Sequence, residues 1–151
     1  MSSVPARTGA AFVDLEFDTA ARGVAQFGDI ASSLVVLDEL IRDLASLAAT
    51  RTGAEFRDIE IAAIDIRNPL KVRLSVFAVS AEALGAFQEL GREIIRGRIT
   101  GADSVAAILA RCLPQDEHPA PTDQEIARLH GHAVSLQQAT VALTRVRVMP
   151  G

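Results

Sequence analysis

The chain has 151 residues, 49% of them hydrophobic and 23% charged, which suits one domain with its own core and excludes a disordered chain. Its single cysteine, Cys112, excludes an intrachain disulfide framework and a metal site built on several thiolates. The net charge of −4, with neither Trp nor Tyr, argues against general nucleic-acid binding, which needs a basic surface and usually stacking aromatics.

Charge is unevenly distributed along the chain. Residues 1–65 contain five arginines against eleven acidic residues, whereas residues 66–98 contain six basic residues against three acidic ones. Residues 99–151 are nearly balanced, with four basic and five acidic residues. This split permits two oppositely charged faces, and it favours association with a second copy or with another protein.

The first predicted element is a strand at residues 11–17, where apolar residues alternate with others. One face carries Ala11, Val13, Leu15 and Phe17, and the other carries Phe12, Asp14, Glu16 and then Asp18. Alternation with period two predicts a half-buried strand with an acidic outer face.

The second predicted element is a helix from Asp29, which can cap the first turn, to about residue 50. Its apolar seam has a period of 3.5 and consists of Ile30, Leu34, Leu37, Ile41, Leu44 and Ala48. Asp38 and Asp43 lie on the polar side. The pattern favours a core helix, and an intermolecular coiled coil is the alternative.

Two strands at residues 56–66 and 70–79 flank Arg67, Asn68 and Pro69 and predict a hairpin. The alternation of the first strand slips by one residue near residues 62–63. This slip predicts a β-bulge, and a strand buried on both faces is the alternative. The second strand alternates cleanly, with Lys71 and Arg73 facing outward.

Helices follow at residues 81–96 and 100–113. Gly85 and Gly91 weaken the first of them, so we expect a close backbone contact at these positions. Cys112 lies on the apolar stripe of the second, which indicates a small buried hydrophobic residue and not a reactive thiol. Thr122 and Glu125 form a capping box that opens a last helix, and residues 132–149 are compatible with either a continued helix or a fourth strand.

The resulting fold class is α+β, with a small three- or four-stranded, mostly antiparallel sheet and helices on one face. The expected order is strand, helix, strand, strand and three helices. Residues 1–10 are expected to form a flexible terminus, residues 11–113 the core, and residues 114–121 a proline-rich linker. Residues 122–151 then form a helix, or a helix and a strand, that packs on the core or on a partner.

Motifs for catalysis are absent from the sequence, which has no phosphate loop and no nucleophile elbow. His130 and His132 are weak candidates for a metal site, because residues two apart on a helix point about 200° from each other. We therefore expect no catalytic residue, no cofactor and no metal, and a chain that is not an enzyme.

The residues expected to form an interaction surface are charged. Arg67, Lys71 and Arg73 open the only net-positive third of the chain. Their acidic counterparts are Asp14, Glu16 and Asp18 on the first strand and Asp38 and Asp43 on the first helix. A charge-complementary contact, within one chain or between two, is the hypothesis, and a cross-strand charge lattice on an exposed sheet face is the alternative.

These patterns favour a non-catalytic protein–protein interaction or adaptor domain, acting in a homo-oligomer or in a larger assembly of bacterial type. The alternative is a binder of a small ligand or divalent ion, or a minor enzyme, with an acidic and basic pocket on the sheet. The expected partners are the chain itself or another protein, with neither nucleic acid nor membrane. No apolar run reaches the ~18 residues of a membrane span, and we expect a cytoplasmic location.

Overall fold

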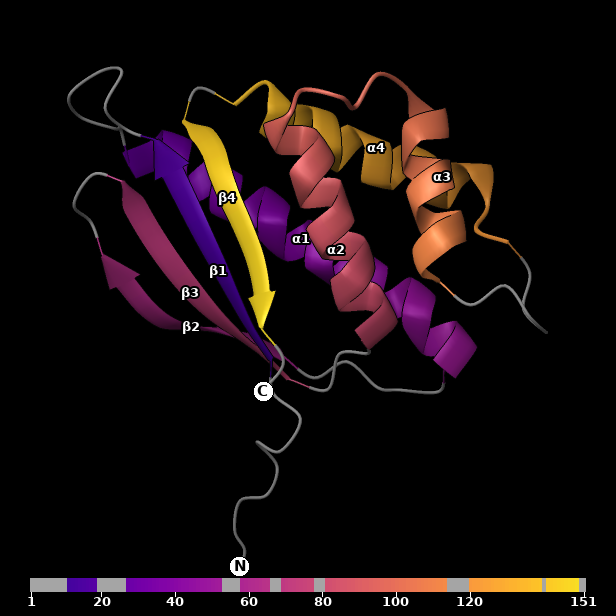
Figure 1. The fold of residues 1–151 in the computed structure, drawn as a ribbon, viewed down its shortest axis with the longest axis horizontal. Helices are drawn as coiled ribbons and strands as arrows, with labels where there is room; N and C mark the ends of the chain where they lie inside the picture. The colour runs from indigo at the N-terminus through magenta and orange to yellow at the C-terminus, as the bar shows by residue number, and fades with distance from the viewer. Residues whose placement is uncertain are drawn as a thin grey trace, which may run out of the picture.

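The computed structural model describes residues 11–18, 27–52, 58–65, 69–77, 81–113, 120–139 and 141–149. In chain order the elements are β1 (Ala11–Asp18), α1 (Phe27–Thr52), β2 (Asp58–Asp65), β3 (Leu70–Phe77), α2 (Ala81–Ile95), α3 (Ala102–Cys112), α4 (Asp123–Gln137) and β4 (Ala142–Met149). The fold is α+β, and the four strands form an antiparallel sheet in the order β2-β3-β1-β4 (Figure 1). The predicted fold class is confirmed.

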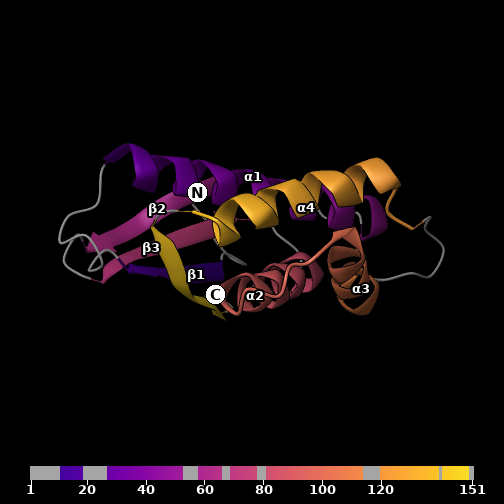
Figure 2. The same ribbon diagram turned by 90° about the horizontal axis from the view of Figure 1, so that it is seen from above.

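The helices cover one face of this sheet. Figures 1 and 2 show α1 lying behind the strands, α4 running beside α1, and α2 lying next to β4. The core lies between these layers, and its largest fully buried side chains include Leu15, Phe17, Leu37, Leu40, Ile41, Leu44 and Phe87. The apolar seam of α1 therefore packs within this chain, as the core-helix interpretation requires.

β1 occupies the centre of the sheet and follows the predicted alternation. Ala11, Val13, Leu15 and Phe17 are buried beneath the helices, while Phe12, Asp14 and Glu16 on the other face remain partly accessible. Directly opposite residues on neighbouring strands share a face, so the register extends this division to the rest of the sheet. The side chains of β1 thus alternate between an apolar face of the sheet that the helices cover and a charged face that is partly accessible.

β2 contains the predicted bulge. Its register against β3 shifts between Ile61 and Ala63, which brings Ile61 opposite Leu74 and Ile64 opposite Val72. Both isoleucines therefore point to the helical side of the sheet. The alternative of a strand buried on both faces is wrong, because Ile61 and Ile64 are 58% and 51% exposed.

The C-terminal segment combines both alternatives that its sequence left open. α4 continues through Gly131 to Gln137, and β4 then pairs with β1 as the fourth strand. Leu129, Ala133 and Leu136 of α4 belong to the same core as the rest of the chain. The predicted order therefore lacked a final strand. Residues 1–10 and most of the predicted linker lie outside the described residues.

The two glycines of α2 differ in what surrounds them. A Cβ built on Gly91 would lie 2.8 Å from Cγ2 of Val146 on β4, so the predicted close contact is confirmed there. A Cβ on Gly85 would meet nothing within 4 Å, so the prediction is wrong for this residue. Gly91 thus lets α2 approach β4.

Among the described residues, no helix has the length and apolarity needed to cross a membrane.

Candidate functional site

The face of the sheet that no described helix covers is charged, and we call it the charged face. It consists of Asp14 and Glu16 on β1, Lys71 and Arg73 on β3, Arg145 and Arg147 on β4, and Asp65 on β2. The register sets Asp14 between Arg73 and Arg147, and Glu16 between Lys71 and Arg145. Three strands that are distant in sequence therefore place opposite charges side by side.

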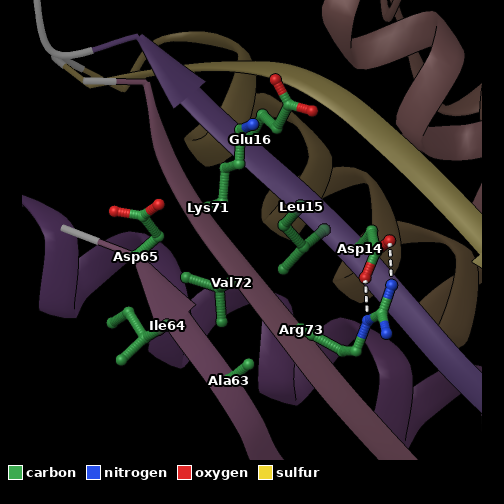
Figure 3. Close-up of a pocket in the computed structure, with 9 residues that line it drawn as sticks. All are labelled: Asp14, Leu15, Glu16, Ala63, Ile64, Asp65, Lys71, Val72 and Arg73. Carbon is green, nitrogen blue, oxygen red and sulfur yellow. Dashed lines mark hydrogen bonds and ion pairs between the residues drawn. The ribbon is translucent and has the colours of Figure 1, made fainter. Parts of the chain in front are cut away.

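The strongest contact on the charged face joins Arg73 to Asp14. The guanidinium donates through Nε to Oδ1 at 2.7 Å and through Nη2 to Oδ2 at 3.0 Å (Figure 3). The same guanidinium lies 5.4 Å from the ring centre of Phe12. The hydrogen bond from Arg73 lowers the pKa of Asp14, against the effect of burial, and the charges of Arg73, Arg147 and Arg145 lower it further.

We expect Arg73→Gln to raise the pKa of Asp14 towards the ordinary value of 3.8. In the wild type this lowered pKa stabilises the fold above the ordinary pKa, and the contribution is lost as the pH falls through the lowered value. Lys71→Gln is the matched control on the same strand, because Lys71 does not contribute to the shift. An NMR titration of the Asp14 carboxyl measures both variants, and an equal shift in the control would contradict the assignment.

The other charged side chains of the charged face make longer hydrogen bonds than the Arg73–Asp14 pair, or none to another charged residue. Arg145 donates to Glu16 at 3.3 Å, and Thr144 Oγ1 donates to the carbonyl oxygen of Glu16 at 3.2 Å. Within the described part of the chain, the side chains of Lys71 and Arg147 make no such ion pair. These exposed cations can therefore be engaged by a ligand or by another protein without breaking an existing pair.

A hollow of about 240 Å³ lies where β2 meets β3 and β1, near the bulge. Its lining residues are Asp14, Leu15, Glu16, Ala63, Ile64, Asp65, Lys71, Val72 and Arg73 (Figure 3). The small side chain of Ala63, opposite Arg73, leaves this space open. Lys71 lies opposite Glu16 on β1 and opposite Asp65 on β2. The hollow is therefore lined by side chains of positive and of negative charge.

The acidic residues predicted on the first helix lie elsewhere. Asp38 pairs with Arg42 on its own helix, with 3.0 Å between Nε and Oδ1. Asp43 accepts from Nε of Arg128 on α4 at 2.7 Å, and its Oδ2 lies 3.0 Å from Nε2 of His132. The acidic side of α1 thus contacts α4 of the same chain and does not meet Lys71 or Arg73.

The remaining predicted residues are dispersed. Asp18 is exposed at the end of β1, opposite Ala142, while Arg67 lies outside the described residues. His130 is half-buried on α4, two residues before His132, and the described ranges contain no group of three potential metal ligands. Burial raises the pKa of the partly buried Cys112 thiol, as does the charge of Glu89. The sequence predicted a buried residue at this position, whereas the side chain is only partly buried.

Sequence reasoning missed two sets of residues. Arg145 and Arg147 complete the charged face, and the alternation of residues 144–148 (TRVRV) was their available signal. Ile61 and Ile64 are apolar and exposed at an edge of the sheet, and no sequence signal distinguishes them from core residues.

No family model matches the chain, and searches of curated proteins and of solved structures also find no match.

Proposed function

We propose that this chain is a non-catalytic protein-interaction domain that binds its partner along β2. The observation that carries the proposal is the exposure of Ile61 and Ile64 on the helical side of an edge strand. Their cross-strand neighbours on β3, Leu74 and Val72, are buried, so the core that packs on β3 leaves these two positions of β2 exposed. Adjacent apolar side chains at the edge of a sheet are typical of a surface that another protein covers.

The charged face supports the same function. It continues from β2 across the sheet, and it offers Lys71 and Arg147 as cations that a partner can engage. Apolar contact at the strand edge supplies affinity, and the neighbouring charges supply orientation and selectivity. This combination suits an adaptor within a homo-oligomer or a larger assembly better than a catalytic pocket.

The test is the mass of the native particle. Tagged wild-type protein purified from its host is expected to exceed its monomer mass of 16.0 kDa by light scattering. The double variant Ile61→Lys/Ile64→Lys is expected to return to the monomer mass with an unchanged unfolding temperature. Lysine on an edge strand opposes strand addition, and both positions are exposed.

The control is Ile95→Lys, which places the same charge on another exposed isoleucine. Ile95 is 37% exposed and lies at the last residue of α2, where a cation suits the helix dipole. This variant should keep the wild-type mass. A monomeric wild type that is stabilised by a metabolite or divalent ion in a thermal-shift screen would instead support the ligand-binding alternative.

A further inference from the structure

A second hollow, of about 350 Å³, lies between the neighbouring helices α1 and α4, which Figure 2 shows side by side. Four residues at spacings of three and four, and therefore on one side of α1, form the first wall: Asp29, Ser32, Ser33 and Val36. The end of α4 and the two residues after it form the other wall, with Ser135, Leu136, Gln138 and Ala139. This volume lies in the range of small-ligand sites, about 300–1,000 Å³.

The hydroxyl of Ser33 is a polar group of this hollow that the chain itself does not satisfy. Ser33 is 4% exposed, which makes it the most deeply buried polar residue in the described part of the chain. Within that part its side chain has no hydrogen-bond partner, although it lines the hollow. A buried hydroxyl without a partner costs free energy, and buried polar groups in proteins are nearly always paired. A molecule inside the hollow therefore has to supply this hydrogen bond.

The charges around the hollow favour a cation as that molecule. Asp29 is the one charged residue in the described lining, and it makes no ion pair with another described residue. α4 has no basic residue in its last turn, so none of the side chains there balances the negative end of its helix dipole. An anion in the hollow would face both a carboxylate and the carbonyl end of a helix.

We infer that this hollow binds a small organic ammonium ion, a primary amine on a short alkyl chain. An ammonium group has three donors and no acceptor, which matches the carboxylate of Asp29, the hydroxyl of Ser33 and one further oxygen of the lining. Val36, Leu136 and Ala139 offer apolar contact to the alkyl chain. This binding site is independent of the interaction function proposed above.

A bare metal ion suits the hollow less well than an alkylammonium ion. The described residues contain no group of three histidine, cysteine, aspartate or glutamate side chains that could hold a metal. A hard cation prefers several carboxylate or carbonyl oxygens, whereas the described lining has one carboxylate and an apolar wall. The apolar wall contributes to binding when the ligand has an alkyl chain.

The test compares three probes that share one alkyl chain and differ in its end group, which are n-butylamine, n-butanol and butyrate. Their binding to the full chain is measured at one ionic strength by calorimetry and by NMR of the backbone amides. We expect the amine to bind roughly tenfold more tightly than the alcohol, and butyrate not to bind, because the end group faces Asp29. The amide shifts should lie at Ser32 and Ser33 and at the end of α4.

Ser33→Ala should weaken binding of the amine roughly tenfold, because a hydrogen bond to a charged donor is lost. The matched control is Ser46→Ala, which removes an exposed hydroxyl from the same helix and should leave binding unchanged. Without amine, Ser33→Ala should not lower the unfolding temperature, since the deleted hydroxyl has no partner in the chain. A lower unfolding temperature would show that the hydroxyl is bonded within the chain, and it would contradict the inference.

Asp29→Asn should abolish the preference for the amine over the alcohol. Its control is Asp123→Asn, which removes the first-turn acid of α4 and should retain the preference. Equal binding of the three probes, amide shifts away from these helix ends, or no binding of the amine, which would leave water alone at Ser33, would overturn the inference. Ile61→Lys/Ile64→Lys should bind the amine as the wild type does, so this site and the interaction function fail separately.

Discussion

Leu15→Ala is expected to lower the free energy of unfolding by about 2–5 kcal/mol, whereas Ile61→Ala is expected to change it by less than about 1 kcal/mol. Both side chains are aliphatic and both point to the helical side of the sheet. Leu15 is fully buried at the centre of the sheet, whereas Ile61 is 58% exposed on the edge strand. Truncating Leu15 therefore leaves a cavity, whereas truncating Ile61 removes a side chain that is mostly in water.

Chemical denaturation measured at one pH checks this prediction directly. The slope of the transition should be the same for the two variants and the wild type, so that the midpoints compare stability alone. Ile61→Ala should meanwhile weaken binding at the β2 edge, which separates the role of this residue in association from any role in folding. A loss for Ile61→Ala as large as that for Leu15→Ala would show that the edge of β2 is covered within the chain.

The two glycines of α2 provide the second large contrast. Gly91→Ala is expected to lower the free energy of unfolding by about 1–3 kcal/mol, because the added Cβ would lie 2.8–3.1 Å from the side-chain atoms of Val146. Val146 is β-branched and its χ1 is restricted, so it cannot turn aside without a shift of the strand or helix. A larger residue at position 91 should separate α2 from β4 altogether.

Gly85→Ala is the matched control in the same helix. A Cβ at this exposed position meets nothing within 4 Å, and alanine favours the helix over glycine by about 0.5–1 kcal/mol. We therefore expect this variant to be more stable than the wild type. Combining Gly91→Ala with Val146→Ala should recover part of the loss, because two of the three close atoms are then removed. Destabilisation of equal size at both glycines would contradict the close approach of α2 to β4.

The pairing of Asp43 changes the interpretation of the acidic helix. From the sequence, Asp38 and Asp43 were one acidic surface that could face the basic hairpin. In the structure Asp43 joins α1 to α4 through Arg128 and His132, while Asp38 pairs within its own helix. Which basic side chain pairs with Asp43 depends on the helix that packs beside α1. The spacing of apolar and charged residues along α1 alone does not identify that helix.

Several features of this chain are determined by short stretches of its sequence. The alternation of residues 11–17 assigns the two faces of β1, and the slip near residues 62–63 predicts the bulge of β2. The capping box is also local, since Thr122 Oγ1 accepts from the N–H of Glu125 at 3.1 Å and the Glu125 carboxylate accepts from the N–H of Thr122 at 2.8 Å. Such features involve neighbouring residues only, so no knowledge of the rest of the fold is needed.

The tertiary structure alone decides which of these elements meet. β4 joins β1 and brings Arg145 and Arg147 to the charged face, and the order β2-β3-β1-β4 leaves β2 at an edge. Leu15 and Ile61 have the same kind of pattern in the sequence, and their burial differs because the core covers β1 and leaves Ile61 on the edge strand exposed. Sequence patterning therefore determined that β2 has an apolar side, and the packing of the helices determined that Ile61 and Ile64 on this side remain exposed.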